Sequence, residues 1–266
     1  MKKVVFILPL VALAAIGCKQ PASGDEAKET EVDSLPAQAE VAQLLSPETE
    51  EVSNTSTPYR YITAYSGLSL REFNNTKSKR LAKMPYGSRV EVVEAEQQPT
   101  MTIAGISGSM DKVVFDHRSG YAFSGYLSRY FPPEDEITVE GYANELKKVF
   151  PEVIYRKEKG GTASKPMLTE SIELPGAQWH EAFFIAQRLF EFPGEFQFPS
   201  PKGKELEILQ DSKPKRGLWV SQLEVSRTDD GLEKIEYVYS SARFSNRATI
   251  EKKGNSLVVS RTEKAK

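Results

Sequence analysis

The chain of 266 residues has very few of the side chains that bind metals or act as nucleophiles. It contains one cysteine, Cys18, and two histidines, His117 and His180, which are too far apart for a two-histidine zinc motif. It also lacks a G-x-S-x-G turn and a glycine-rich phosphate loop. A single cysteine allows no disulfide within the chain, so burial must supply the stability. We therefore predict that the protein is not an enzyme and uses no cofactor or metal.

The N-terminal apolar run is too short to cross a bilayer as a helix. Val4 to Ile16 carries no charge but spans only 13 residues, whereas a membrane-spanning helix needs about 20. Lys2 and Lys3 precede the run, and a small residue separates it from Cys18. A basic start, a short apolar centre and small residues before a cleavage site predict an export signal.

The residues around Cys18 resemble a bacterial lipoprotein signal peptide. Ala15-Ile16-Gly17-Cys18 stands where that family has its lipobox, with Ala15 in the place of the usual leucine. The resemblance implies that residues 1–17 are removed and that acyl chains are attached at Cys18, which would anchor the protein stably to a membrane. We expect a lipid-anchored protein of the cell envelope, in the outer membrane rather than the inner one. The alternatives are an uncleaved signal anchor and an ordinary secreted protein.

The next segment, residues 18–57, is acidic and has no aromatic residue. Nine aspartates and glutamates stand against two lysines in it. Such a composition cannot bury enough apolar surface to offset the entropy lost on ordering, so we predict a disordered stalk. Without the signal and the stalk the remaining chain is close to neutral, which argues against nucleic-acid binding.

Residues 58–133 contain short alternating runs between turn residues and no long helical pattern. Strands are predicted at Tyr59–Tyr65 and Arg89–Glu94, with Pro85-Tyr86-Gly87 as a turn between them. Several short strands at such spacing are typical of a small all-β barrel or sandwich.

The order of motifs in this segment resembles the bacterial SH3 domains. Gly67-Leu68-Ser69-Leu70-Arg71 is similar to their opening G-L-N-V-R, and Gly125-Tyr126-Leu127-Ser128 is similar to their closing S-x-Y-L-S. Residues 100–109 lengthen the central hairpin relative to the family pattern. The resemblance implies an SH3-like barrel over 58–133, which would bind peptidoglycan or an envelope protein in a groove lined by aromatic residues.

The resemblance also implies which residues would line that groove. Met110 and Tyr121 stand where the family usually has tryptophans. The competing interpretation is that the large side chains fill the interior of the barrel. We favour it for Met110 and Tyr121, because successive side chains of a strand point to opposite faces and one of two neighbours must point inward. The residues of the predicted groove are Tyr86, Met110, Tyr121, Phe123 and Tyr126.

Residues 134–266 predict an α+β domain and carry no motif that indicates a family. Apolar periodicity predicts helices over Thr138–Phe150 and Ala177–Phe190. Lys157–Lys165 is predicted to be a flexible loop. From Glu205 onward the chain alternates almost to its end, which favours an antiparallel meander packed by helices.

The second predicted helix carries Phe184 in the middle of its polar face. His180 and Glu181 share that face, and we expect them to be solvated. The sequence that follows repeats Phe-x-Phe-Pro. Either this loop folds back over Phe184 as a second small core, or the rings form an exposed patch for a partner. The residues of that predicted patch are Phe184, Phe192, Phe196 and Phe198.

Three functions follow from these patterns. The leading hypothesis is a lipid-anchored envelope protein whose SH3-like segment binds peptidoglycan or an envelope protein. The alternative is a protein–protein adaptor whose recognition module is the domain of residues 134–266. The third is a cell-wall hydrolase that uses carboxylates alone, since the chain has 37 aspartates and glutamates and their spacing reveals no catalytic pair.

Overall fold

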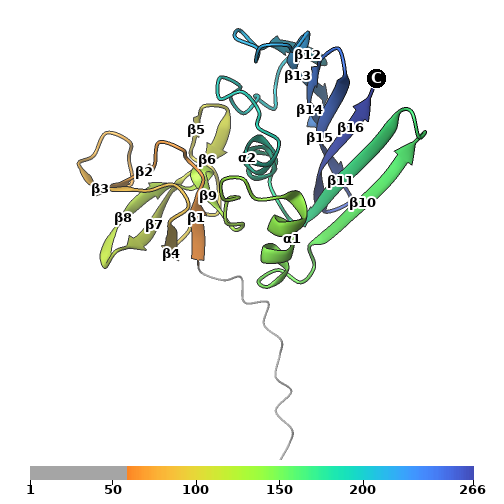
Figure 1. Ribbon diagram of the computed structural model, residues 1–266. Coiled ribbons are helices and arrows are strands. Elements are labelled where there is room, and N and C mark those ends of the chain that lie inside the picture. Colours follow the sequence, from red (N-terminus) through yellow and green to blue (C-terminus); the bar gives the residue numbers. More distant parts are fainter. Residues whose placement is uncertain (1–58) are drawn as a thin grey trace, which may run out of the picture. The chain divides into compact units, whose positions relative to one another are not determined.

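The computed structural model describes residues 59–266, drawn in colour in Figure 1. The predicted export signal, the lipid attachment at Cys18 and the acidic stalk of residues 18–57 all lie outside these residues. Ser53–Lys266 form one compact unit. No helix within residues 59–266 has the length and apolar character that a membrane span requires.

The described chain consists mainly of antiparallel β-strands, which confirms the prediction of a β-rich protein. Sixteen strands form two sheets of seven and one sheet of two, and every recorded strand pair is antiparallel. Two α-helices and one short 3-10 helix complete the secondary structure of residues 59–266.

The first sheet covers most of the segment with SH3-like motifs. Its order is β3-β2-β8-β7-β4-β1-β9, so its edges are β3 and β9, and these two strands do not pair. The sheet is therefore not a closed barrel, and the predicted SH3-like barrel is not confirmed. β9 has only two residues and pairs only with β1, which leaves too few main-chain groups to close the sheet. The strands are β1 (Tyr59–Ile62), β2 (Leu68–Arg71), β3 (Arg80–Met84), β4 (Arg89–Glu94), β7 (Met110–Phe115), β8 (Arg118–Phe123) and β9 (Leu127–Ser128).

The residues that lengthen the central hairpin form a small sheet of their own. β5 (Met101–Ile103) and β6 (Ile106–Gly108) pair across a two-residue turn, Ala104-Gly105, in which both residues have positive φ. A Cβ atom at Gly105 would lie 3.3 Å from the carbonyl oxygen of Phe198, so the tip of this hairpin touches the loop after the second helix.

The second sheet has the order β10-β11-β16-β15-β14-β13-β12 and contains the predicted meander from β12 to β16. The prediction of a flexible loop over Lys157–Lys165 is wrong for most of that range, because β10 extends to Gly161 and pairs with β11. β10 is an edge strand with much of its surface in solvent, so its charged sequence gives no apolar alternation. The strands are β10 (Ile154–Gly161), β11 (Pro166–Pro175), β12 (Leu206–Gln210), β13 (Val220–Thr228), β14 (Gly231–Ser240), β15 (Phe244–Lys253) and β16 (Ser256–Ala265).

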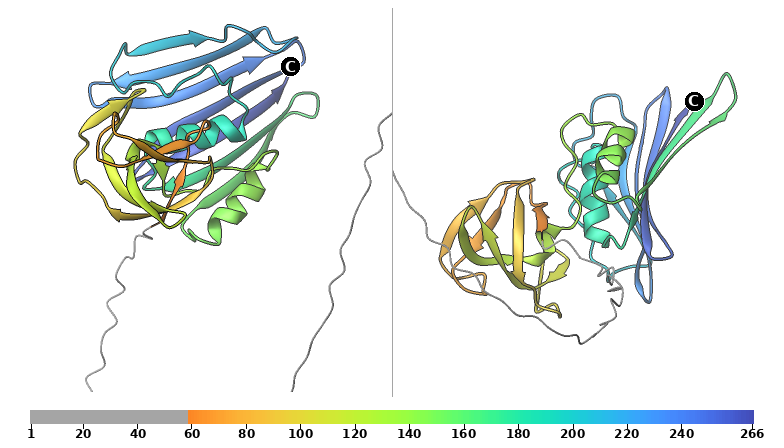
Figure 2. Two further views of the ribbon diagram at one scale, coloured as in Figure 1. Left: turned by 90° about the vertical axis from the view of Figure 1, so that its left-hand side faces the viewer. Right: turned by 90° about the horizontal axis from the view of Figure 1, so that it is seen from below.

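Both α-helices cover one face of the second sheet, as Figure 2 shows. α1 (Val139–Lys147) begins where the Thr138 hydroxyl accepts a 3.0 Å hydrogen bond from the Gly141 amide, the usual role of a threonine N-cap. α2 (Trp179–Leu189) packs Phe183 into the core of the sheet. Both helices lie inside the ranges predicted for them.

Candidate binding surfaces

Two residues of the predicted aromatic groove are buried in the first sheet. Met110 is 3% exposed and Phe123 is 4% exposed, and the two face each other across β7 and β8. Tyr121 is half-buried against the same core. The burial of Met110 confirms the interpretation that it fills the interior. These residues therefore do not form the walls of an accessible groove.

The other two residues of the predicted groove contact parts of the chain beyond the first sheet. The ring of Tyr126 lies 6.0 Å from the ring of Phe184 on α2. Tyr86 stacks on Tyr65 at 4.8 Å, and the guanidinium group of Arg188 lies 5.8 Å from the centre of the Tyr65 ring. Burial raises the pKa of Tyr86, which keeps its hydroxyl neutral. The tyrosines expected to meet a ligand are thus in contact with α2 or with a ring that α2 approaches.

The second predicted site, the exposed phenylalanine patch, is wrong for three of its four members. Phe192, Phe196 and Phe198 are buried. Phe183 contacts Phe192 at 6.0 Å and Phe198 at 5.7 Å, and the Gln187 side chain ties the loop to α2 by donating to the Phe196 carbonyl at 3.0 Å. Phe184 is half-buried against Tyr126. The loop is therefore part of the core, in agreement with the folded-back alternative.

The polar face of α2 is not solvated, contrary to the sequence-based expectation. His180 is 8% exposed and Glu181 is 5% exposed. The Glu181 carboxylate accepts hydrogen bonds from the Ser128 hydroxyl at 2.7 Å and from the Arg129 and Gln178 amides at 2.9 and 2.8 Å. Burial lowers the pKa of His180, although the Glu181 charge opposes that shift. Ser128 at the end of β9 and Arg129 after it cover Glu181, and Phe198 lies against His180, which periodicity within one helix cannot reveal.

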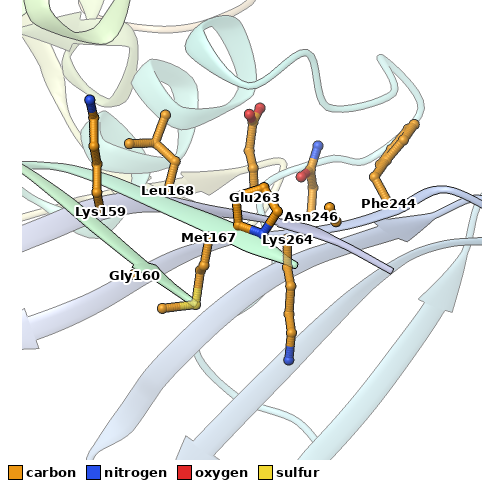
Figure 3. A pocket seen from close by; sticks show the side chains of 10 residues that line it. Lys159, Gly160, Met167, Leu168, Phe244, Asn246, Glu263 and Lys264 are labelled. Atoms are coloured by element: carbon orange, nitrogen blue, oxygen red, sulfur yellow. The ribbon is translucent and has the colours of Figure 1, made fainter. Parts of the chain in front are cut away.

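The largest apolar pocket among the principal cavities lies at one end of the second sheet (Figure 3), and we call this region the open end. It has a volume of about 610 Å³, within the range of small-molecule and cofactor sites. In Figure 3 Leu168, Asn246 and Phe244 rise from the same side of the sheet, whereas Met167 extends to the other side. The lining residues are Lys159, Gly160, Pro166, Met167, Leu168, Phe244, Asn246, Glu263, Lys264 and Ala265.

A row of aromatic rings connects the core to the open end. Phe192 and Tyr237 are buried with ring centres 4.8 Å apart, Tyr237 stacks on Tyr239 at 5.0 Å, and Tyr239 meets Phe244 at 6.2 Å. Phe244 is the last ring of this row, and it is 37% exposed. The row therefore holds a partly exposed phenyl ring at the mouth of the pocket.

Asn246 is the buried polar residue of this pocket. Its amide nitrogen donates a 2.7 Å hydrogen bond to the Tyr239 hydroxyl, which fixes both side chains. Its amide oxygen is buried and has no hydrogen-bond partner among residues 59–266. A buried acceptor without a partner costs about 1–3 kcal/mol of stability. Asn246 lies on the same face of β15 as Phe244 and Ala248. A polar residue among apolar residues at alternate positions is the feature of the sequence that could have indicated this site.

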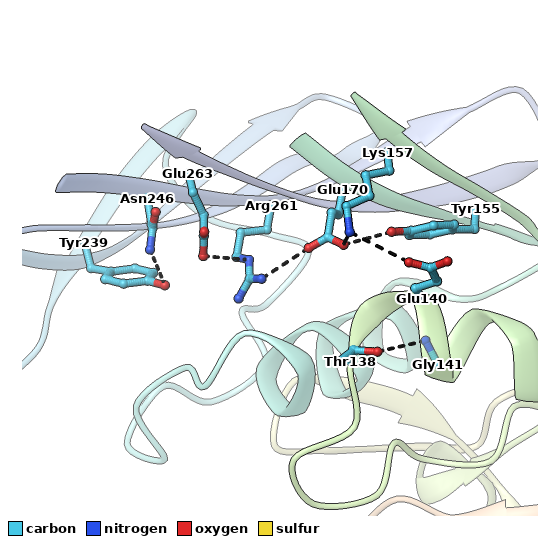
Figure 4. Close-up of polar contacts among 10 residues, drawn as sticks. All are labelled: Thr138, Glu140, Gly141, Tyr155, Lys157, Glu170, Tyr239, Asn246, Arg261 and Glu263. Atoms are coloured by element: carbon cyan, nitrogen blue, oxygen red, sulfur yellow. Dashed lines mark hydrogen bonds and ion pairs between the residues drawn. The ribbon is translucent and has the colours of Figure 1, made fainter. Parts of the chain in front are cut away.

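A row of charged and polar side chains crosses the same face of the sheet (Figure 4). Glu170 accepts a 2.8 Å hydrogen bond from the Tyr155 hydroxyl, and its oxygens lie 3.4 Å from Lys157 Nζ and 3.4 Å from an Arg261 nitrogen. Burial by itself would raise the pKa of Glu170, but the Tyr155 hydrogen bond and the two cations outweigh it and lower the pKa. Arg261 also lies 3.4 Å from Glu263, which lines the pocket. The row is therefore an ionised network beside an apolar pocket.

Within residues 59–266 no three histidine, cysteine, aspartate or glutamate side chains are grouped so that they could hold a metal ion. The carboxylates of the polar row lie beside cations, and Glu170 also accepts the hydrogen bond from the Tyr155 hydroxyl. Such a row can orient a bound partner by charge. No protein-family model, curated protein or solved structure matches the chain.

Proposed function

We propose that the chain is a lipid-anchored binding protein of the cell envelope, which holds a partner protein at the open end of its second sheet. The observation that carries this proposal is the aromatic row that ends in the partly exposed Phe244 at the mouth of the 610 Å³ pocket. A rigid ring beside an apolar pocket is the usual form of an interface hot spot.

The surroundings of Phe244 favour a protein partner. Lys159, Glu263 and Lys264 surround the apolar wall with both signs of charge, and the row from Tyr155 to Arg261 continues this polar margin. Protein interfaces combine an apolar centre with a polar rim in this way. The charged side chains of the margin would select the partner and its orientation. The Phe244 ring and the pocket would supply most of the affinity.

The first half of the described chain acts in this proposal as a support rather than as the recognition module. We infer an SH3-type fold for residues 58–133, supported by the motif order and by the short antiparallel strands, with a sheet that stays open between β3 and β9. We likewise propose that residues 134–266 form an α+β domain, supported by the two helices on one face of the second sheet. The burial of Met110 and Phe123 and the contact of Tyr126 with Phe184 argue against peptidoglycan binding in the aromatic groove.

The N-terminal anchor remains a prediction from the sequence. Acylation at Cys18 would fix the chain to a membrane, and the outer membrane is the expected location. Residues 18–57 would then separate the folded unit from the lipid surface.

Photo-crosslinking in intact cells tests the proposal. p-Benzoyl-L-phenylalanine replaces Phe244 at the pocket or Glu251, which is exposed on the opposite side of the same strand. We expect one discrete protein adduct from position 244, none from position 251, and loss of the adduct when Leu168→Asp places a charge in the pocket wall. Identical adducts at both positions, or none at 244, would contradict the proposal.

A further inference from the structure

Two smaller cavities adjoin each other beside the start of α2, and we call them together the seam. Their volumes are about 390 and 400 Å³, and Ser107, Gln178 and His180 line both. Ser107 comes from the β5–β6 hairpin, which lengthens the SH3-like pattern. The seam is separate from the open end, since the two share no lining residue.

His180 is a buried titratable side chain in the wall of the seam. It is more than nine-tenths buried, and its ring stands edge-on to Phe198 at 6.0 Å, which fixes its plane. Within residues 59–266 no hydrogen bond holds either ring nitrogen, and neither nitrogen is among the fully buried atoms without a partner, so the ring nitrogens are open to the seam. Because burial lowers its pKa, the imidazole is neutral and offers one donor and one acceptor. A buried imidazole in this state is complemented by a ligand that both accepts and donates.

The other walls of the seam carry the same mixed hydrogen-bonding character. Ser109 and Ser124 line one cavity, where their hydroxyl oxygens lie 3.3 Å apart, and Asn255 lines the other. A hydroxyl or an amide can act as donor and acceptor, as a neutral imidazole can. The half-buried indole of Trp179 adds a flat apolar wall to the second cavity.

Formal charges in the seam cancel. Arg60 and Lys252 stand against Glu96 and Asp111, and Asp111 is already engaged by the Ser109 hydroxyl at 2.8 Å. The seam therefore selects neither an anion nor a cation by net charge. A neutral ligand rich in hydroxyl groups, with one apolar face, matches these walls.

We propose that the seam binds a carbohydrate chain, with one sugar unit in each cavity, the apolar face of one unit against Trp179, and hydroxyl groups on His180, Gln178 and Ser107. A pyranose ring has both parts of this pattern, because its C–H face is apolar and its hydroxyl groups donate and accept. This site is independent of the proposed partner site at the open end.

The chain offers two built-in reporters for a binding experiment. It has only two tryptophans, and Trp219 is 71% exposed, so Trp219→Phe in the full chain leaves Trp179 as the only indole. It has only two histidines, so ¹⁵N shifts of the His180 ring can be compared with those of His117. The probes are chitotetraose, cellotetraose and maltotetraose, each up to about 10 mM, where a weak site is still detected. Tetraglycine is the peptide control.

We expect at least one tetrasaccharide to change Trp179 fluorescence saturably and to shift the His180 nitrogens while leaving those of His117 unchanged. His180→Leu should weaken binding roughly tenfold or more, the usual effect of losing well-made hydrogen bonds, and His117→Gln should have no effect. The His180 shifts need no substitution in the seam, so the test does not depend on how that variant folds. The proposal is overturned if no tetrasaccharide moves either reporter, if tetraglycine acts equally well, or if folded His180→Leu protein binds normally.

Discussion

The Ser128 hydroxyl donates a 2.7 Å hydrogen bond to the carboxylate of Glu181, 53 residues further along the chain. The Arg129 and Gln178 amides complete the set of donors to that carboxylate. A buried carboxylate is tolerated only where donors replace its hydration, so these contacts fix the start of α2 to the end of the first sheet. The same attachment fixes the start of α2, where Gln178 and His180 line the seam.

The first prediction concerns this buried carboxylate. Glu181→Ala should lower the free energy of unfolding by about 3 kcal/mol, because it leaves the Ser128 hydroxyl and two amides without their acceptor. Glu145→Ala is the matched control on α1, where an exposed glutamate pairs with Lys148 and the loss should stay within about 0.5 kcal/mol. Equilibrium urea unfolding measures both. Equal effects of the two substitutions would show that Glu181 is not the attachment described.

The second prediction concerns the contact between Tyr126 and Phe184. A double-mutant cycle with Tyr126→Ala and Phe184→Ala should give a coupling free energy of about 0.5–1.5 kcal/mol, the usual range for contacting aromatic rings. Tyr126→Ala combined with Phe73→Ala, an exposed ring, serves as the reference pair and should be additive. Additivity in the first pair would place the two rings apart in solution.

The third prediction concerns the loop after α2. Phe192→Ala should lower the free energy of unfolding by about 3–5 kcal/mol, because Phe192 packs between Phe183 and Tyr237 in the core. The exposed Phe73→Ala should change it by less than about 0.5 kcal/mol. Thermal and urea unfolding of both variants provide the comparison. A mild effect of Phe192→Ala would restore the interpretation of this loop as an exposed patch.

The fourth prediction concerns the pH dependence of stability. The pKa of Glu170 is lower in the folded chain than its ordinary value of 4.5. Its ionised form therefore stabilises the fold above about pH 4.5, and this contribution is lost as the pH falls through the lowered pKa. Glu170→Gln should flatten the decline in unfolding free energy below pH 4.5. If the variant declines as steeply as the parent chain, the network around Glu170 does not hold it ionised.

Much of the fold could be predicted from local pattern. Periodicity and Thr138 mark the start of α1, and alternation from Glu205 onward marks the meander. β10 could not be found in this way, because an edge strand with solvated faces needs no apolar alternation and its glycines indicate a loop. Closure of the first sheet could not be judged either, since it depends on pairing between distant edges rather than on any single strand.

The sites were harder to predict than the elements. Helical periodicity placed His180 and Glu181 opposite the core of α2, but it could not show that Ser128 and Arg129 contact Glu181 or that Phe198 lies against His180. The motifs of residues 58–133 named Tyr126 as a ligand residue without revealing its contact with Phe184. The open end brings together residues from four strands, so only the fold shows that Leu168 and Phe244 share a pocket.

One measurement tests the central claim most directly, namely that recognition lies at the open end rather than in the aromatic groove. The photoreactive residue p-benzoyl-L-phenylalanine replaces Tyr126 in one strain and Phe244 in another, and intact cells are irradiated. The proposal predicts an intermolecular protein adduct from position 244, and the contact of Tyr126 with Phe184 predicts only an intrachain product from position 126. Intermolecular adducts at position 126 with none at position 244 would contradict it.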